Sequence, residues 1–339
     1  MTVYKAGVRS ATQGQRTTRS MLVVLGIALA ALVMSTTASA QYPTKPIRLF
    51  VPAAAGDGTD IVARLLAHQL TESLGQTLVV ENRPGAGGSI AAAVVAAAAP
   101  DGHTLMLANG SSHGVTPGLY PHLPYDTLTD FAAITLIAVS PNLLVVNPNT
   151  PAVDIASFLA WVRANPGKVD VASAGNGSLS HLSVEMLRSL GHLSIVNVGY
   201  KSAALALNDL AAGQVAAMII NIPSTLALVK AGKLRAIATT SATRTSLMPD
   251  LPTLAEAGLT GYETLAWFGL VAPARTPVAI LRRLQSETAR ALARPELREQ
   301  LHSMGAEPVG NSPEAFANFM KSEITKYTKV IHEAGIKVE

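Results

Sequence analysis

No cysteine occurs in the 339 residues of this chain. Disulfide bonds, thiol chemistry and a lipid anchor on cysteine are therefore excluded. A chain of this length can bury a large hydrophobic core, so it does not need disulfides even in an oxidising compartment.

The N-terminal apolar run is too short for a transmembrane helix, which needs about 20 residues. This run, residues 21–34, follows four basic residues and is followed by Ala38-Ser39-Ala40. The order of basic, apolar and small residues predicts a secretory signal peptide over residues 1–40, cleaved after Ala40, and a periplasmic location. An Arg-Arg pair is missing there, which favours the general secretory route over twin-arginine export.

The predicted mature chain also lacks an excess of either charge. Residues 1–40 carry four of the 26 Lys and Arg residues and none of the 22 Asp and Glu residues, which leaves 22 of each. A neutral chain gives no support to nucleic-acid binding, which needs a basic surface. Metal-ligand spacing such as H-E-x-x-H is absent, and Ile90 occupies the place of the third glycine in a dinucleotide fingerprint. We therefore expect no metal and no cofactor.

Fixed-period repeats and low-complexity blocks are absent as well. Instead, short Val, Ile and Leu runs alternate with helical stretches, which is typical of parallel α/β layers. The expected helices are residues 60–74, 154–164, 180–190 and 203–212, followed by 277–293, 295–304 and 313–333, and each of the last three begins at a proline.

The length of the mature chain fits two domains. Strands 141–148 and 263–273 carry proline or polar residues and lie where the chain could cross between two layers, so we interpret them as hinge strands. The predicted organisation is a discontinuous first domain, residues 41–142 and 265–339, and a second domain, residues 143–264.

Four expected strands each lead into a polar or glycine-rich turn and then toward a helix. The turns are residues 56–59, 81–89, 109–112 and 173–178. A helix start leaves backbone N–H groups without intrahelical partners, and these groups can bind an anion. Convergence of these turns would form a polar pocket.

Several sequence blocks occur in a family-specific order. They are YPTKPIR at 42–48, ENRPGAGG at 81–88, APDGHT at 99–104, SAGNGS at 173–178, PDLPT at 249–253 with EAG at 256–258, and WFGL at 267–270. On these blocks, the chain resembles the periplasmic solute-binding proteins of tripartite tricarboxylate transporters, the Bug or TctC-like family, over all of residues 41–339.

The resemblance implies an α/β fold of the two-lobed, type II periplasmic-binding-protein (Venus-flytrap) class, in which each lobe is a mostly parallel sheet flanked by helices. It implies a monomeric receptor that captures a di-, tri- or aromatic carboxylate through backbone amides, Ser, Thr and Asn groups and ordered water. Such a receptor performs no chemistry and delivers its ligand to the subunits of a tripartite membrane transporter. The matching positions are Ala54, Gly56, Asp57, Thr59, Asp60, Ser111, Ser112, His113, Asn176, Ser180, His181, Lys201, Ser202, Ala203 and Asn221.

Two places depart from the family pattern. Ala53-Ala54-Ala55-Gly56-Asp57 stands where the family usually has Phe-Pro-Pro-Gly-Gly, and Ile220 replaces the usual Asp before Asn221. The first change predicts a less rigid loop, a wider pocket and a carboxylate that would repel an anionic ligand if it pointed inward. Together the changes suggest a larger or more apolar acid, for example an aromatic one.

Some of these residues also have a structural interpretation. Asp60 could cap the helix that follows it. His113 and His181 could make structural hydrogen bonds, and Lys201 could be solvated. Trp267 could pack at the hinge instead of lining the cleft.

Two alternative functions follow from the same residues. Gly110-Ser111-Ser112-His113-Gly114 matches the G-x-S-x-G elbow of serine hydrolases, with Ser112 as nucleophile, although Thr116-Pro117-Gly118 interrupts the helix that should follow. A two-lobed receptor could also deliver its ligand to a periplasmic sensor kinase. For the receptor itself, Ser112→Ala and Asn176→Ala are each expected to weaken ligand binding while leaving the unliganded melting temperature nearly unchanged.

Overall fold

A mixed sheet organises the fold of this chain, for which a computed structural model describes residues 42–337. The strand order is β2-β1-β3-β9-β4-β7-β5-β6, and β8 and β10 also pair with β4. Residues from Lys45 onward form one compact unit. The predicted signal peptide and its cleavage site lie outside the described residues.

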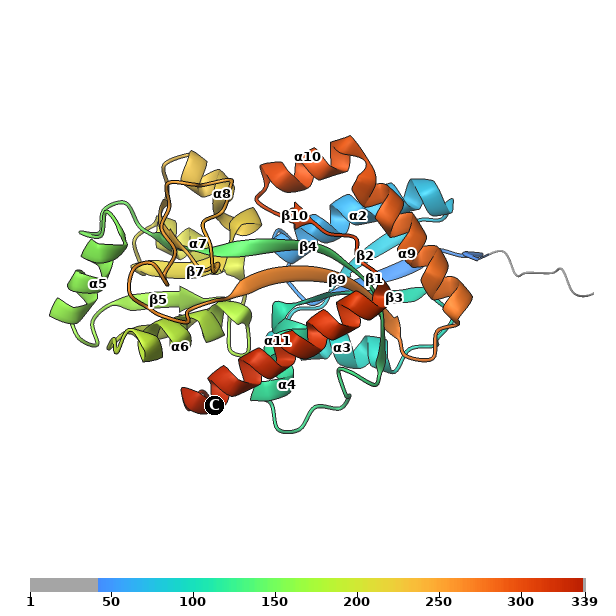
Figure 1. The fold of residues 1–339 in the computed structure, drawn as a ribbon, viewed down its shortest axis with the longest axis horizontal. Coiled ribbons are helices and arrows are strands. Elements are labelled where there is room, and N and C mark those ends of the chain that lie inside the picture. The colour runs from blue at the N-terminus through green and yellow to red at the C-terminus, as the bar shows by residue number, and fades with distance from the viewer. Residues whose placement is uncertain (1–41, 338–339) are drawn as a thin grey trace, which may run out of the picture. The chain divides into compact units, whose positions relative to one another are not determined.

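The first half of the sheet is built on three parallel strands, β1 (Ile47–Val51), β2 (Leu78–Asn82) and β3 (Thr104–Asn109). These strands are largely apolar, as expected where helices cover both faces of a parallel sheet. Figure 1 shows helices on both sides of this half. They are α2 (Gly58–Leu74), α3 (Ser89–Ala96), α9 (Val278–Ala293), α10 (Pro295–Ser303) and α11 (Pro313–Glu333).

The second half has the same construction. Strand β5 (Asp170–Ser173) pairs in parallel with β6 (Val196–Gly199) and β7 (Ala217–Asn221). Strand β8 (Arg235–Thr239) is antiparallel to β4. The helices of this half are α5 (Ile155–Ala164), α6 (Leu179–Leu190), α7 (Ala203–Ala211) and α8 (Ile222–Lys230).

Two long strands, β4 (Phe131–Val146) and β9 (Leu265–Pro273), connect the halves and run side by side through the middle of Figure 1. Strand β4 pairs with β9 as far as Pro141 and with β7 from Asn142 onward. The short strand β10 (Glu307–Pro308) pairs with β4 as well. This change of partner puts one strand into both halves of the sheet.

The predicted helices agree with the structure to within a few residues, but β4 is longer than predicted. It begins at Phe131, whereas the sequence indicated a strand from 141. Its earlier part contains Thr135 and Ser140, which are buried. Their hydroxyl groups donate to the carbonyl groups of Asn311 and Gly305, both at 2.7 Å. These partners are distant in sequence, so local patterning did not reveal that the polar positions belong to a buried strand.

Each half contains a hydrophobic cluster of its own. The first includes Phe50, Met106, Trp267 and Phe316. The second includes Leu143, Ala172, Met218 and Leu226. Separate cores of this kind are characteristic of domains that could move relative to each other.

A buried polar cluster joins the two crossing strands where β4 changes partner. The Asn142 side chain donates to Thr264 Oγ1 at 3.1 Å, and Ser183 Oγ donates to the same atom at 3.0 Å. Thr240 Oγ1 donates to the Thr264 carbonyl at 2.6 Å. Because these groups are buried, their hydrogen bonds fix the register of the crossing point.

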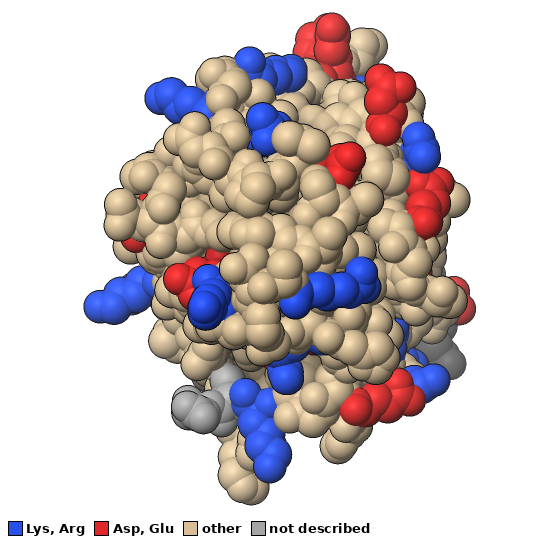
Figure 2. Space-filling model, turned by 90° about the vertical axis from the view of Figure 1, so that its left-hand side faces the viewer, with Lys and Arg blue, Asp and Glu red and all other residues tan. Residues whose placement is uncertain are grey.

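The face shown in Figure 2 carries basic and acidic side chains interspersed with broad uncharged areas. Within residues 42–337, none of the helices combines the length and the apolar character needed to span a membrane.

Candidate binding site

A cavity of about 610 Å³ lies where the two halves of the sheet meet. Its lining comes mainly from the turns that follow β1, β2 and β3 in one half and β5, β6 and β7 in the other. Ligands of open α/β sheets bind outside the carboxyl ends of the parallel strands, which is where these turns lie. The structure therefore brings together the four turns that the sequence predicted to form a polar pocket.

In the described chain, five helical segments begin at this cavity with a polar N-cap residue that lines it. They are α2 capped by Asp57, η3 (Gly110–Val115) capped by Asn109, α6 capped by Ser178, α7 capped by Ser202 and α8 capped by Asn221. Each cap side chain accepts a hydrogen bond from the backbone of its own helix. Helix N-termini carry partial positive charge, so their convergence favours a bound anion.

The caps leave some backbone donors available to a ligand. In α6, Ser178 Oγ accepts from the His181 amide at 3.0 Å, and in α7, Ser202 Oγ accepts from the Leu205 amide at 3.3 Å. Among the hydrogen bonds of residues 42–337, none engages the amides of Ser180 and Ala203, which also line the cavity. These two N–H groups can bind a carboxylate oxygen.

The hydroxyl and amide side chains at the cavity mostly have structural partners. Ser180 Oγ donates to the Ile219 carbonyl at 2.5 Å, and the Asn221 side chain accepts from the Ser224 amide at 3.0 Å. Asn109 Nδ2 donates to Thr59 Oγ1 at 3.1 Å. The side chains therefore hold the helix starts in place, and the backbone is left as the main donor.

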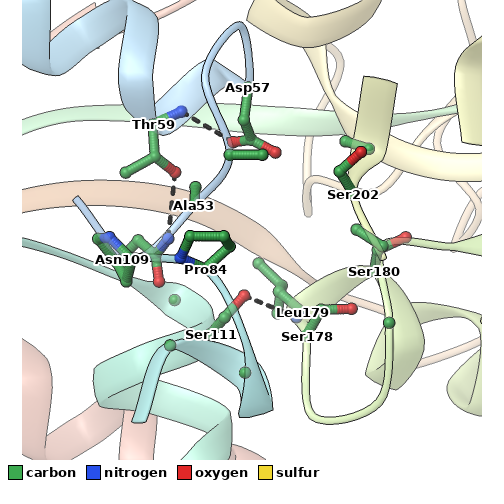
Figure 3. Close-up of a pocket in the computed structure, with 18 of the residues that line it drawn as sticks. Ala53, Asp57, Thr59, Pro84, Asn109, Ser111, Ser178, Leu179, Ser180 and Ser202 are labelled. Carbon is green, nitrogen blue, oxygen red and sulfur yellow. Dashed lines mark hydrogen bonds between the residues drawn. The ribbon is translucent and has the colours of Figure 1, made fainter. Parts of the chain in front are cut away.

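The cavity contains ten of the residues predicted from the sequence. They are Ala54, Asp57, Thr59, Ser111, Asn176, Ser180, Lys201, Ser202, Ala203 and Asn221. Figure 3 shows Ser111 on one side and Ser180 and Ser202 on the other, with Asp57 above them. The other five predicted residues, Gly56, Asp60, Ser112, His113 and His181, do not line it.

Asp60 positions the loop before α2 and does not face the cavity. It accepts hydrogen bonds from the Gly56 amide, Arg64 and Asn82, at 2.9, 3.0 and 2.9 Å. Burial alone would raise the pKa of Asp60, but these hydrogen bonds lower it overall. The predicted capping role was assigned to the wrong residue, because the N-cap of α2 is Asp57, whose carboxylate accepts from the Thr59 amide at 3.0 Å.

Ser112 and His113 are fully buried outside the cavity. Ser112 forms a reciprocal capping box with Asn109, and its Oγ lies 3.0 Å from His113 Nδ1. The elbow interpretation gains no support from this geometry, because a nucleophile must face its substrate. The sequence also predicted an interruption at 116–118, whereas helix α4 (Thr116–Leu119) continues there with Pro117 in its first turn, where a proline is tolerated.

Burial lowers the pKa of both histidines that the sequence placed near a ligand. It lowers the pKa of His113 to about 3, and the ring packs edge-on against Phe131 with centroids 4.7 Å apart. Burial also lowers the pKa of His181, against the opposing effect of Glu185. Both rings are therefore neutral at pH 7. They are buried beneath the starts of η3 and α6, which support the cavity.

Several lining residues were not among the fifteen candidate ligand-binding residues, although the turn 81–89 was predicted to be part of the pocket. The loop Pro84–Gly88 contributes to the cavity, as do Tyr120 and Trp267. The glycine-rich turn was the available signal for the loop. Trp267 combines the two alternative roles considered for it, since it lines the cavity and also packs edge-on against Phe316 at 5.8 Å.

Direct hydrogen bonds join the two halves across the cavity. The Gly58 amide at the start of α2 donates to Ser224 Oγ of α8 at 2.9 Å. The Leu179 amide of α6 donates to Ser111 Oγ at 2.9 Å. These bonds hold the two halves together at the cavity.

The charged side chains that line the cavity, among the described residues, are Asp57 and Lys201. Lys201 is exposed. Burial raises the pKa of Asp57 in spite of its hydrogen bonds with Thr59. Within the part of the chain that the structure describes, no group of His, Asp and Glu residues could hold a metal ion.

Ser112→Ala is expected to destabilise the protein, which revises the expectation from the sequence. Loss of the capping-box hydroxyl should lower the free energy of unfolding by about 1–2 kcal/mol. Asn176→Ala should leave it nearly unchanged, because Asn176 is exposed. Urea denaturation of both variants tests this, and equal stability of Ser112→Ala and the wild type would contradict the buried role of Ser112.

The fold and cavity define an α/β binding protein whose two halves enclose a cavity of small-molecule size. Residues 62–336 match the family described as "Tripartite tricarboxylate transporter family receptor". The chain therefore belongs to this family of solute-binding receptors, as the resemblance in its sequence blocks indicated.

Individual relatives support the same assignment. BugT of Bordetella pertussis is 36% identical over 321 residues, which cover 94% of this chain and 98% of BugT. The structure of R. palustris Rpa4515 with adipate has a TM-score of 0.84 and 38% identity, covering 87% of this chain and 99% of that one. MatC (Rpa3494) from Rhodopseudomonas palustris with bound malate has a TM-score of 0.81 and 35% identity, covering 86% and 100%. These matches confirm the predicted periplasmic-binding-protein fold.

Proposed function

We propose that this protein is an exported receptor that captures a small organic carboxylate in the cavity and performs no chemistry on it. The convergence of five capped helix N-termini on one cavity carries the proposal. Such a site can hold an anion through aligned N–H groups without an ion pair. The adipate and malate complexes of its relatives are consistent with this class of ligand.

In the proposed complex, the amides of Ser180 and Ala203 donate to a ligand carboxylate from the second half. Ser111, Asn176 and ordered water complete the polar contacts. Residues 84–88 cover the ligand from the side of the first half. The cavity volume of about 610 Å³ lies within the range of small-molecule sites, about 300–1,000 Å³. It leaves room for a ligand larger than a four-carbon acid.

Three apolar side chains support an extension of the ligand class toward larger or aromatic acids. Ala53, Ala54 and Ile220 line the cavity, whereas Ala55 is exposed and does not line it. Small side chains at 53 and 54 leave space that larger ones would fill. Ile220 contributes apolar surface to the second half.

We further propose that capture proceeds by closure of two domains, residues 41–142 with 265–339 and residues 143–264, about β4 and β9. Ligand binding drives closure only if the closed form binds better than the open form. The receptor would act as a periplasmic monomer and present its ligand to a tripartite-type transporter. The family description supports this partner over a sensor kinase.

The experiment is a thermal-shift screen of residues 41–339, unfolded and refolded to remove carried-over ligand. The compounds are aliphatic dicarboxylates, tricarboxylates, acidic amino acids and aromatic acids, each with its neutral amide as the control. A ligand at 100 times its Kd should stabilise the fold by about 2.7 kcal/mol. Stabilisation by an acid and not by its amide supports the proposal, and a folded protein that responds to none of the acids contradicts it.

A further inference from the structure

We infer that the ligand of this cavity carries a protonated amine in addition to a carboxylate, and that Asp57 recognises the amine. This inference rests on the proposed function, because it specifies the chemistry of the ligand in the same cavity. It starts from the one acidic side chain among the described lining residues.

The Asp57 carboxylate has no cationic partner among residues 42–337. Asp60, three residues later, is paired with Arg64 at 3.0 Å, but no Lys, Arg or His residue of the described chain forms an ion pair with Asp57. One oxygen accepts from the Thr59 amide at 3.0 Å. Figure 3 shows the carboxyl group at the start of α2, on the opposite side of the cavity from Ser180 and Ser202. Asp57 lines the cavity, so a ligand there can approach its carboxyl group.

Capping alone does not require this negative charge. The other caps at the cavity, Asn109, Ser178, Ser202 and Asn221, are all neutral. Neutral Asn and Ser cap helices as well as Asp does. In a site built to hold an anion, a carboxylate weakens binding by repulsion unless the ligand also brings a positive group.

The surroundings of Asp57 favour a cation from the ligand. Burial raises the pKa of this carboxyl group, which shows that removal from water penalises its charged form. An ammonium group at hydrogen-bond distance would offset that penalty, and charge-assisted hydrogen bonds are the strong ones. The helix N-termini of α6 and α7 remain available for the carboxylate of the same ligand.

The test compares ligands of equal length by isothermal titration calorimetry on refolded residues 41–339. The pairs are succinate and aspartate, glutarate and glutamate, adipate and 2-aminoadipate, and adipate and 6-aminohexanoate. In each pair whose chain length the cavity accepts, the amine-bearing ligand should bind at least about tenfold more tightly than the plain dicarboxylate. Malate, which has a neutral hydroxyl group, should lie between succinate and aspartate.

Asp57→Asn separates charge from capping, because asparagine retains the cap. This variant should keep the melting temperature of the wild type, lose the preference for the amine, and bind the plain dicarboxylate at least as well. Asp154→Asn is the matched control, since Asp154 caps α5 in the same way, is exposed and lies outside the cavity. It should leave the preference unchanged.

Equal or tighter binding of the plain dicarboxylates by the wild type, or an unchanged amine preference in Asp57→Asn, would overturn the inference and leave the proposed function intact. Failure of every compound in the series to bind the folded protein would overturn the proposed function as well.

Discussion

Gly58→Ala is expected to weaken ligand binding by about 10- to 100-fold without lowering the stability of the unliganded protein. A methyl group on Gly58 would overlap the Asn221 side-chain oxygen and lie 2.9 Å from Asn221 Cγ and 3.1 Å from Ser224 Oγ. All of these atoms belong to the second half, so under the proposed closure the clash arises only when the halves come together. Overpacking of this kind costs about 1–3 kcal/mol, and 1.4 kcal/mol is tenfold in affinity. Calorimetric titration with the best acid from the screen measures the loss.

Gly56→Ala is the matched control in the same loop. A methyl group on Gly56 would have no atom within 4 Å, but its φ of +82° is a conformation that favours glycine. This variant should lose about 1 kcal/mol of stability while keeping the wild-type affinity. Wild-type affinity in Gly58→Ala would contradict the proposal that ligand binding closes the halves at this contact.

The second large effect is acid sensitivity caused by His113. Its pKa is about 3 in the folded protein, because of burial, and about 6.5 when unfolded. The unfolded state therefore binds a proton that the folded state excludes, so the stability that this group contributes is complete above pH 6.5. It is lost as the pH falls toward 3, by up to about 1.4 kcal/mol per pH unit.

Urea unfolding between pH 7 and 4.5 measures this dependence, in a range where most carboxyl groups remain ionised. His113→Gln should reduce the slope of unfolding free energy against pH by close to one proton. His122→Gln, which changes an exposed histidine, is the control for removal of one such side chain. Equal slopes for the wild type and His113→Gln would show that the buried ring is not the source of acid sensitivity. Residual slope is expected from His181, whose pKa burial also lowers.

The fold could be predicted largely from the sequence, because apolar runs, prolines and glycine turns act locally. Helix α11 begins and ends where the pattern placed it, at Pro313 and Glu333. The start of β4 was missed because Thr135 and Ser140 are satisfied by Asn311 and Gly305, which lie far along the chain. Tertiary hydrogen bonds of this kind leave no local signal.

The site was predicted to the level of loops, and less well to the level of side chains. Polar residues near a helix start can face a ligand or serve their own backbone, and sequence spacing does not separate the two roles. Asp57 and Asp60 show this. Asp57 lines the cavity, whereas Asp60 accepts hydrogen bonds from Arg64, Asn82 and the Gly56 amide. Ser111 and Ser112 differ in the same way, since a single position along η3 turns the side chain from the cavity into the core.

The most direct test of the account is a crystal structure of the refolded protein with the acid that gives the largest thermal shift. We expect a carboxylate oxygen at about 3 Å from the backbone nitrogen of Ser180 or Ala203, with the two halves closed through the Gly58–Ser224 contact. A carboxylate held only by Lys201, or bound outside the cavity, would contradict the central claim that the helix N-termini form the receptor site.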